Sequence, residues 1–175
     1  MKTLIVIDMQ NDFIDGALGT PEAQAIVPKV KKKIEEYISR GDKVLFTRDT
    51  HYRHHYLDSL EGKNLPVEHC INGTGGWMIE RSLQEFVRIY DGNVVNKYTF
   101  GYPDWKERLG WVNGPIELVG LCTDICVVSN ALILKANFPE TEITVDASCC
   151  AGTTPENHKA ALQVMKCCQI NVIGE

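Results

Sequence analysis

The sequence predicts an α/β fold in which a parallel sheet is covered by helices on both faces. Short apolar runs alternate along the chain with segments in which apolar residues recur at helical spacing. The apolar runs lack the alternation of polar and apolar residues that is typical of a half-exposed strand. Both faces of these strands are therefore expected to be buried, as they are in a parallel sheet between two layers of helices.

Six short apolar runs are predicted to be strands. They cover residues 3–7, 43–47, 93–96, 116–121, 142–145 and 170–173. The first of them (TLIVI) is apolar after its initial threonine, and the fourth (IELVGL) is interrupted by a single acidic residue. Runs of this length suit strands better than helices, which are usually longer.

Between these runs, apolar residues recur at the spacing of an amphipathic helix. The predicted helices cover residues 27–38, 79–90, 124–137 and 161–168. Gly41 is placed to end the first helix, because glycine commonly follows the last helical residue. Residues 50–77 have no such period, and we expect a long loop there. Long loops in compact domains are usually functional.

Composition and charge exclude several classes of protein. The chain has 175 residues, and we expect a single domain over residues 1–175. A net charge of −5 argues against nucleic-acid binding, and no apolar run approaches the ~20 residues of a membrane helix. The start of the chain does not resemble a signal peptide. We therefore expect a cytoplasmic protein whose seven cysteines are reduced thiols.

Four chemically versatile side chains lie at or shortly after the ends of predicted strands: Asp8, Asp49, Lys97 and Cys126. Ligands of open α/β sheets bind beyond the carboxyl ends of the strands. These four side chains are therefore expected to meet at one edge of the sheet. Taken singly, each has an ordinary alternative role in a turn, in packing or on the surface.

Cys126 is the candidate nucleophile. It falls in the first turn of the predicted helix 124–137, with Thr123 or Asp124 as the expected cap. Free N–H groups and the helix dipole at such a position favour a thiolate and can also receive an oxyanion. Asp8 could take a proton from the thiol and return it to a leaving amine. Lys97 could keep that carboxylate ionised and stabilise negative charge nearby.

Three sequence blocks resemble the cysteine hydrolases of the isochorismatase-like superfamily. The blocks are IDMQNDF (7–13), NKYTFG (96–101) and GLCTDICV (120–127), and they occur in the family's order. The resemblance implies a three-layer α/β/α sandwich around a six-stranded parallel sheet of order 3-2-1-4-5-6. It also implies a catalytic triad of Asp8, Lys97 and Cys126, and a non-proline cis peptide between Leu121 and Cys122. The N–H groups of Cys122 and Cys126 would form the oxyanion hole.

A metal site is suggested by the pattern around residue 50. Asp49 and His51 lie two residues apart at a strand end, and the segment PVEHC supplies His69. Carboxylate and imidazole ligands suit zinc, iron or manganese. The same residues resemble those with which the nicotinamidases of this family bind a divalent metal. Zinc is the favoured ion, with iron or manganese as alternatives.

The fourth metal ligand is left open between two parts of the predicted loop. Glu61, eight residues before His69, is the preferred candidate because relatives use a Glu or a His in this loop. His54 and His55 are the alternatives, and they could instead be exposed loop residues. Resemblance to nicotinamidases also suggests that Phe13 lines the substrate ring. Trp77 and Tyr102 are weaker candidates for the pocket.

The function implied by the resemblance is hydrolysis of nicotinamide to nicotinate and ammonia through a thioester, a reaction of NAD salvage. One alternative is another small amide or ureide hydrolase with the same triad. A second is a non-catalytic interaction module of this fold. A third is a thiol redox or metal-buffering protein, suggested by the pairs Cys149–Cys150 and Cys167–Cys168. We expect a small-molecule amide as the partner and a homo-oligomer, either a dimer or a tetramer.

Overall fold

The computed structural model describes residues 1–89, 92–111 and 114–175. Its centre is a six-stranded sheet of order β3-β2-β1-β4-β5-β6 in which every neighbouring pair is parallel. The strands are β1 (Thr3–Ile7), β2 (Lys43–Asp49), β3 (Val94–Lys97), β4 (Ile116–Leu121), β5 (Ile143–Ala151) and β6 (Asn171–Ile173). This arrangement confirms the predicted fold class and strand order.

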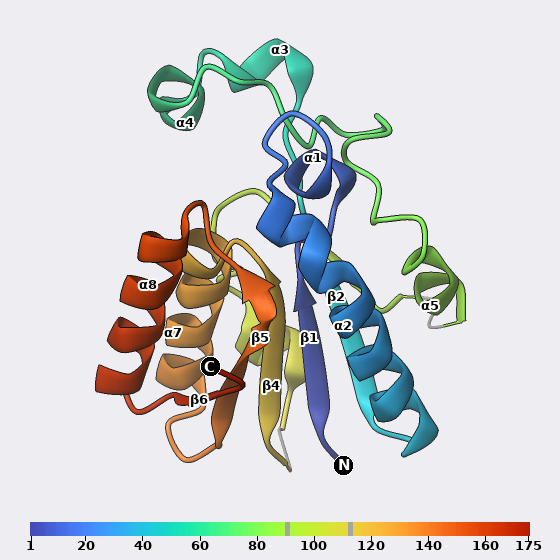
Figure 1. Ribbon diagram of the computed structural model, residues 1–175, viewed down its shortest axis with the longest axis vertical. Coiled ribbons are helices and arrows are strands. Elements are labelled where there is room, and N and C mark those ends of the chain that lie inside the picture. Colours follow the sequence, from blue (N-terminus) through green and yellow to red (C-terminus); the bar gives the residue numbers. More distant parts are fainter. Residues whose placement is uncertain (90–91, 112–113) are drawn as a thin grey trace.

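Helices lie on both faces of the sheet (Figure 1). The helices are α1 (Asn11–Ile14), α2 (Pro21–Ser39), α3 (Arg53–Tyr56), α4 (Leu60–Asn64), α5 (Gln84–Ile89), α6 (Trp105–Leu109), the π-helical turn η1 (Thr123–Val127), α7 (Val128–Asn137) and α8 (Pro155–Cys167). In Figure 1, α2 and α5 lie on one side of the sheet and α7 and α8 on the other, whereas α3 and α4 lie beyond the carboxyl ends of the strands.

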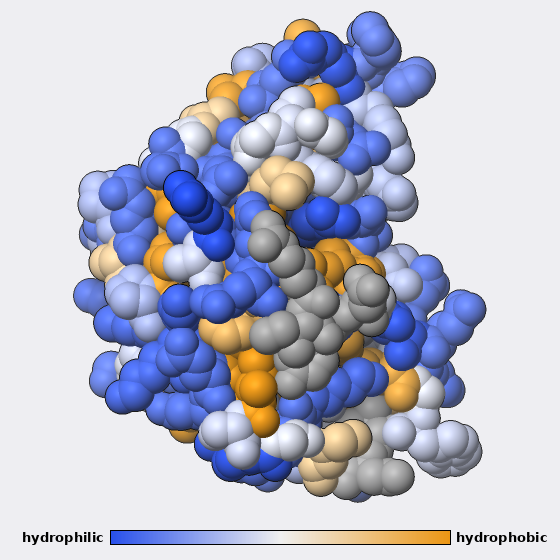
Figure 2. Space-filling view, turned by 90° about the vertical axis from the view of Figure 1, so that its right-hand side faces the viewer, coloured by the Kyte–Doolittle hydropathy of each residue, from blue (hydrophilic) through white to orange (hydrophobic). Residues whose placement is uncertain are grey.

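Each face of the sheet has its own apolar core. Val30 and Ile34 of α2 are fully buried against one face, while Leu134 of α7 and Met165 of α8 are fully buried against the other. On the surface shown in Figure 2, hydrophobic residues form separate patches among hydrophilic ones. Within the described ranges, none of the helices combines the length and the apolar character that a membrane crossing requires.

Several predicted boundaries differ from the structure for identifiable reasons. The first long helix starts at Pro21, because the Thr20 side chain caps it by accepting a hydrogen bond from the Ala23 N–H at 3.0 Å. Strand β5 continues past residue 145 to Ala151, although Asp146 interrupts its apolar run. The predicted helix 79–90 is helical only over Gln84–Ile89, and position 90 lies outside the described residues. The predicted loop 50–77 contains the short helices α3 and α4.

Candidate active site and metal centre

The three predicted catalytic residues meet at the carboxyl edge of the sheet. Lys97, the last residue of β3, lies with its Nζ 2.6 Å from Asp8 Oδ2 and 3.5 Å from Cys126 Sγ. Asp8 directly follows β1, and Cys126 lies in the turn that follows β4. All three residues are at least 95% buried. The structure therefore brings together residues that are far apart in the chain, as the rule for strand ends predicts.

The backbone at Asp8 is held in an unusual conformation. Its φ of 45° lies in the left-handed region that residues other than glycine rarely adopt. The Thr47 hydroxyl fixes the side chain by donating to Asp8 Oδ1 at 2.6 Å, and it accepts from the Asp8 N–H at 3.1 Å. Gly120 pairs with Ile7 in the neighbouring strand, where a β-carbon would collide with the Ile7 carbonyl oxygen. Together, these contacts fix the position of the Asp8 carboxylate, whose Oδ2 lies beside Lys97 Nζ.

Burial dominates the electrostatics of this trio. It raises the pKa of Asp8 even though the neighbouring Lys97 ammonium opposes the shift. Burial also raises the pKa of the Cys126 thiol well above its usual range, again against the influence of Lys97. For Lys97 itself burial acts in the other direction, but the Asp8, Cys126 and Asp49 groups raise its pKa well above the ordinary value. Burial therefore opposes ionisation of the Asp8 carboxyl and of the Cys126 thiol, whereas the neighbouring acidic groups favour the charged form of Lys97.

This result corrects the expected origin of thiol reactivity. Cys126 lies in a π-helical turn rather than in the first turn of an α-helix, and the N-cap residue of that turn is Cys122. The predicted cap residues have other partners: the Thr123 hydroxyl lies 2.8 Å from His158 Nδ1, and Asp124 Oδ1 accepts from the Thr153 N–H at 2.8 Å. The peptide bond between Leu121 and Cys122 is cis, which confirms the implication of the family resemblance.

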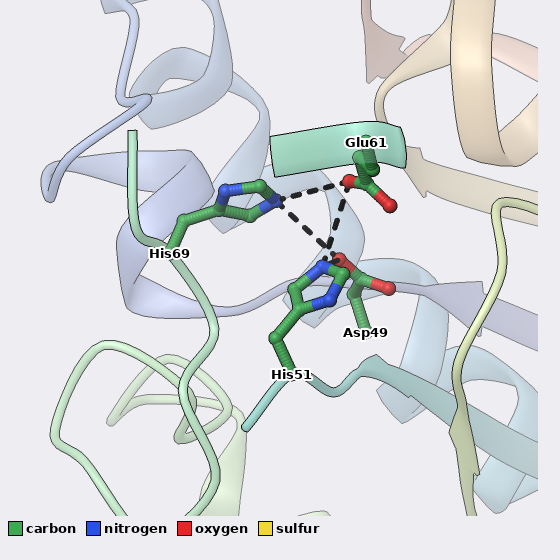
Figure 3. A group of neighbouring side chains, drawn as sticks. All are labelled: Asp49, His51, Glu61 and His69. Carbon is green, nitrogen blue, oxygen red and sulfur yellow. Dashed lines mark hydrogen bonds and ion pairs between the residues drawn. The ribbon is translucent and has the colours of Figure 1, made fainter. Parts of the chain in front are cut away.

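The four favoured metal-binding residues converge at a second centre (Figure 3). One potential ligand atom from each of Asp49, His51, Glu61 and His69 lies within 4.8 Å of the others. His51 Nε2 lies 2.9 Å from Asp49 Oδ2 and 3.5 Å from Glu61 Oε1. His69 Nε2 lies 3.6 Å from each of the same two oxygens. Asp49 ends β2, His51 lies between β2 and α3, Glu61 comes from α4, and His69 lies in the segment after α4.

The surroundings of His69 and Asp49 determine how these two side chains could bind a cation. His69 Nδ1 lies 2.8 Å from the Val67 carbonyl, to which it donates in the tautomer that leaves Nε2 free as a ligand. Burial opposes ionisation of Asp49, but its contacts with the two imidazoles and with Lys97 keep the pKa of this carboxyl well below its usual range. A carboxylate oxygen and an imidazole nitrogen that carries no proton are suitable ligands for a divalent metal.

Asp49 joins the two centres. Its Oδ2 faces His51, while its Oδ1 lies 3.3 Å from Lys97 Nζ. The sequence analysis did not identify Gln10, which fixes the backbone of Asp49: its Oε1 accepts from the Asp49 N–H at 2.7 Å, and its Nε2 donates to the Asp49 carbonyl at 2.9 Å. Its position within the IDMQNDF block was the available signal.

Asn130 is a second residue that the sequence analysis missed. Its Nδ2 donates to the Cys126 carbonyl at 2.7 Å, and its Oδ1 accepts from Tyr102 N–H at 2.9 Å and from Trp105 Nε1 at 2.8 Å. Asn130 is fully buried, and its hydrogen bonds link the turn of Cys126 to the segment after β3. An isolated amide in the apolar helix after Cys126 was the signal that could have revealed it.

One cavity of about 780 Å³ is lined by both centres. Cys122 and Cys126 contribute to one part of its wall, and Asp49, Glu61 and His69 contribute to another. Phe13 also lines this cavity, with its ring 5.5 Å from that of His69. The thiol and the candidate ligands thus face a common space.

The other candidate residues lie elsewhere. His54 and His55 are exposed on α3, whereas Glu61 is in the ligand group. The Trp77 indole donates to Thr50 Oγ1 at 2.9 Å, and the Tyr102 ring packs on Trp105. The paired thiols differ in burial: Cys149 and Cys150 are buried in β5, but Cys167 and Cys168 are exposed at the end of α8.

Comparisons with known proteins agree with this architecture. A family model described as Isochorismatase domain matches residues 2–174. The nicotinamidase/pyrazinamidase of Mycobacterium tuberculosis is 27% identical over 191 residues, covering 99% of this chain and 98% of that protein. The structure of a nicotinamidase/pyrazinamidase from Bacillus subtilis matches with a TM-score of 0.83 and 29% identity over 98% of both chains. A Pyrococcus horikoshii pyrazinamidase in complex with zinc matches with a TM-score of 0.80 and 24% identity over 99% of both chains. The chain belongs to the isochorismatase domain family.

Proposed function

We propose that this protein is a metal-dependent nicotinamidase that converts nicotinamide to nicotinate and ammonia through a thioester on Cys126. The observation that carries the proposal is the single cavity lined by Cys126 and by three of the four candidate metal ligands. A substrate with a metal-binding ring nitrogen and a carboxamide can span two such sites. The similarity to nicotinamidases over nearly the whole chain supports the same substrate.

The residues of the second centre fit a divalent metal ion. Ligands at about 2.1 Å from a tetrahedral ion lie about 3.4 Å apart. The four measured distances between the imidazole nitrogens and the carboxylate oxygens run from 2.9 to 3.6 Å. We propose zinc, held by Asp49, His51, Glu61 and His69, with iron or manganese as alternatives. When bound, such an ion supplies a Lewis acid for the pyridine nitrogen and makes the carboxamide more electrophilic.

The first half of the reaction is an acyl transfer to sulfur. Asp8 accepts the proton of the Cys126 thiol, and the sulfur attacks the carboxamide carbon. We propose that the N–H groups of Cys122 and Cys126 receive the resulting oxyanion. Asp8 then passes its proton to the leaving nitrogen, so that the C–N bond breaks, ammonia departs and a thioester remains. The raised pKa of Asp8 suits it to hold this proton between the two transfers.

The second half hydrolyses the thioester. Asp8 takes a proton from water, and the resulting hydroxide attacks the thioester carbon. The C–S bond breaks, nicotinate is released, and the proton on Asp8 returns to the Cys126 sulfur. Lys97 remains charged throughout because its pKa is raised well above the ordinary value. Its Nζ, 3.5 Å from the sulfur, stabilises the thiolate whenever it forms.

The test is release of ammonia from nicotinamide with zinc, iron or manganese supplied. Cys126→Ala should abolish turnover, whereas Cys167→Ala, at an exposed thiol on α8, should retain it. His51→Ala should lose bound metal and activity together, whereas His54→Ala, at an exposed position on α3, should lose neither. Metal content is measured on each purified protein.

Each part of the proposal can fail separately. A wild-type protein that leaves nicotinamide intact with all three metals would refute the substrate. Turnover by Cys126→Ala at the wild-type rate would refute the nucleophile. Full metal content in His51→Ala would refute its role as a ligand. Activity confined to another small amide or a ureide would favour the alternative hydrolase of the same family.

A further inference from the structure

The cavity is larger than a single-ring amide requires. Its volume of about 780 Å³ lies in the range of pockets that enclose drug-sized ligands. Its floor includes the buried side chains of Phe13, Ala23 and Leu121. The same cavity is also lined by exposed side chains, so it extends from these buried residues to a mouth at the surface.

The mouth is lined by exposed apolar side chains. Leu60 of α4 and Leu65, which follows this helix, are 77% and 38% exposed. Tyr98 and Phe100, which follow β3, are 60% and 46% exposed. These four residues are called the apolar rim. They come from separate segments but line the same cavity, so a ligand that extends outward from the floor would cover them.

The carboxylates that line the cavity belong to the candidate metal centre. Among the residues that line it, the ionisable carboxylates are Asp49 and Glu61, and both belong to the candidate metal centre. Two uncharged polar residues that also line the cavity are close in sequence to the apolar rim: Asn64 precedes Leu65, and Thr99 lies between Tyr98 and Phe100. An extension that reaches the rim would therefore meet apolar and uncharged polar side chains. A charged group there would lose water without gaining an ionic partner from the lining.

We infer that the site accepts nicotinamides with an unbranched alkyl group on the ring and prefers them to nicotinamide itself. This inference rests on the proposed function. The alkyl group must leave the ring nitrogen free for the metal and the carboxamide free for Cys126. The ring carbon that neighbours neither the nitrogen nor the carboxamide-bearing carbon meets both conditions. An alkyl chain at that carbon can extend toward the apolar rim.

The expected gain follows from apolar burial. Each methylene group removed from water is worth about 0.8 kcal/mol, which corresponds to about a fourfold change in an equilibrium constant. Contacts with the rim are remote from the reacting carbon and are the same in the ground state and the transition state. They should therefore lower KM and leave kcat nearly constant.

The experiment measures kcat and KM for nicotinamide and for its methyl, ethyl, propyl and butyl derivatives at this ring carbon. With wild-type enzyme, kcat/KM should rise about fourfold per carbon, mainly through KM. In the double variant Leu60→Ser/Phe100→Ser, the increase in kcat/KM with chain length should be smaller. Within each variant, kcat/KM for a derivative is compared with kcat/KM for nicotinamide. Leu57→Ser is the control, because Leu57 is exposed to a similar degree, 51%, but does not line the cavity.

The outcomes separate this inference from the proposed function. If nicotinamide is hydrolysed and kcat/KM falls as the alkyl chain lengthens, the inference is overturned and the proposed function stands. An equal flattening in Leu57→Ser and in the double variant would also overturn it, because the rim would then not be the surface that binds the chain. If none of the five amides is hydrolysed, both the inference and the proposed function are wrong.

Discussion

Replacing Lys97 by methionine tests the electrostatic account of the site most directly. Lys97 is 1% exposed, and its Nζ lies 2.6 Å from Asp8 Oδ2 and 3.3 Å from Asp49 Oδ1. Methionine fills a similar space without the positive charge. The substitution would leave two buried carboxylates facing each other. Removing one partner of a buried ion pair costs about 3–5 kcal/mol of unfolding free energy near neutral pH.

This cost should depend on pH in a specified direction. Burial already raises the pKa of Asp8, and Lys97 is the strongest influence that lowers it. Without Lys97 the pKa rises further, so folded Asp8 holds a proton that the unfolded chain releases at about pH 4. The folded state then binds more protons, and stability falls as pH rises. One proton that only the folded state holds gives a slope of at most about 1.4 kcal/mol per pH unit, so the variant should be less stable at about pH 8 than at about pH 6.

Urea unfolding at these two pH values measures the effect, with wild type and variant under identical metal conditions. Lys106→Met is the matched control because Lys106 is exposed on α6. We expect Lys97→Met to have a lower free energy of unfolding than wild type, and this difference should be larger at the higher pH. Lys106→Met should stay close to wild type at both pH values. A deficit below about 1 kcal/mol at both pH values, or one that does not change with pH, would refute the reasoning.

Three further predictions concern the surroundings of the site. Gly120→Ala should destabilise the fold by at least about 3 kcal/mol in urea unfolding, because its φ is +118° and the new β-carbon meets the neighbouring strand. Gly41→Ala, at an open position, should cost clearly less, and equal losses would contradict this account. Asn130→Ala should cost at least about 2 kcal/mol and lower kcat, since it leaves the Cys126 carbonyl and two N–H groups unpaired. Zinc at about a hundredfold its Kd should raise the free energy of unfolding by about 2.7 kcal/mol, and His51→Ala should lose this increment if His51 is a ligand.

The sheet and the composition of the site were predictable because they depend on local signals. Continuous apolar runs identify buried parallel strands, and polar residues at their ends are brought together by the topology alone. This reasoning placed Asp8, Lys97 and Cys126 at one edge before any contact was known. The choice of Glu61 over the two neighbouring histidines came from family resemblance, and the structure places Glu61 in the ligand group.

The parts that were not predicted depend on tertiary contacts. The π-helical turn around Cys126 is not distinguished by its sequence from an α-helical start, so the expected cap and the expected type of turn were wrong. The short helices α3 and α4 are too brief for a detectable hydrophobic period. The function of Gln10 also depends on its surroundings, because only the folded chain brings its amide to both backbone groups of Asp49.

The position of Asp49 limits how substitutions in this protein can be interpreted. One of its carboxylate oxygens faces the imidazoles and the other faces Lys97. Residues that share a partner in this way have free-energy effects that do not add. Removal of Asp49 would therefore alter both the affinity for metal and the charge balance around the thiol. Under the proposed function, a change to the metal ligands would therefore also change the surroundings of Lys97 and Cys126, because the two centres share one side chain.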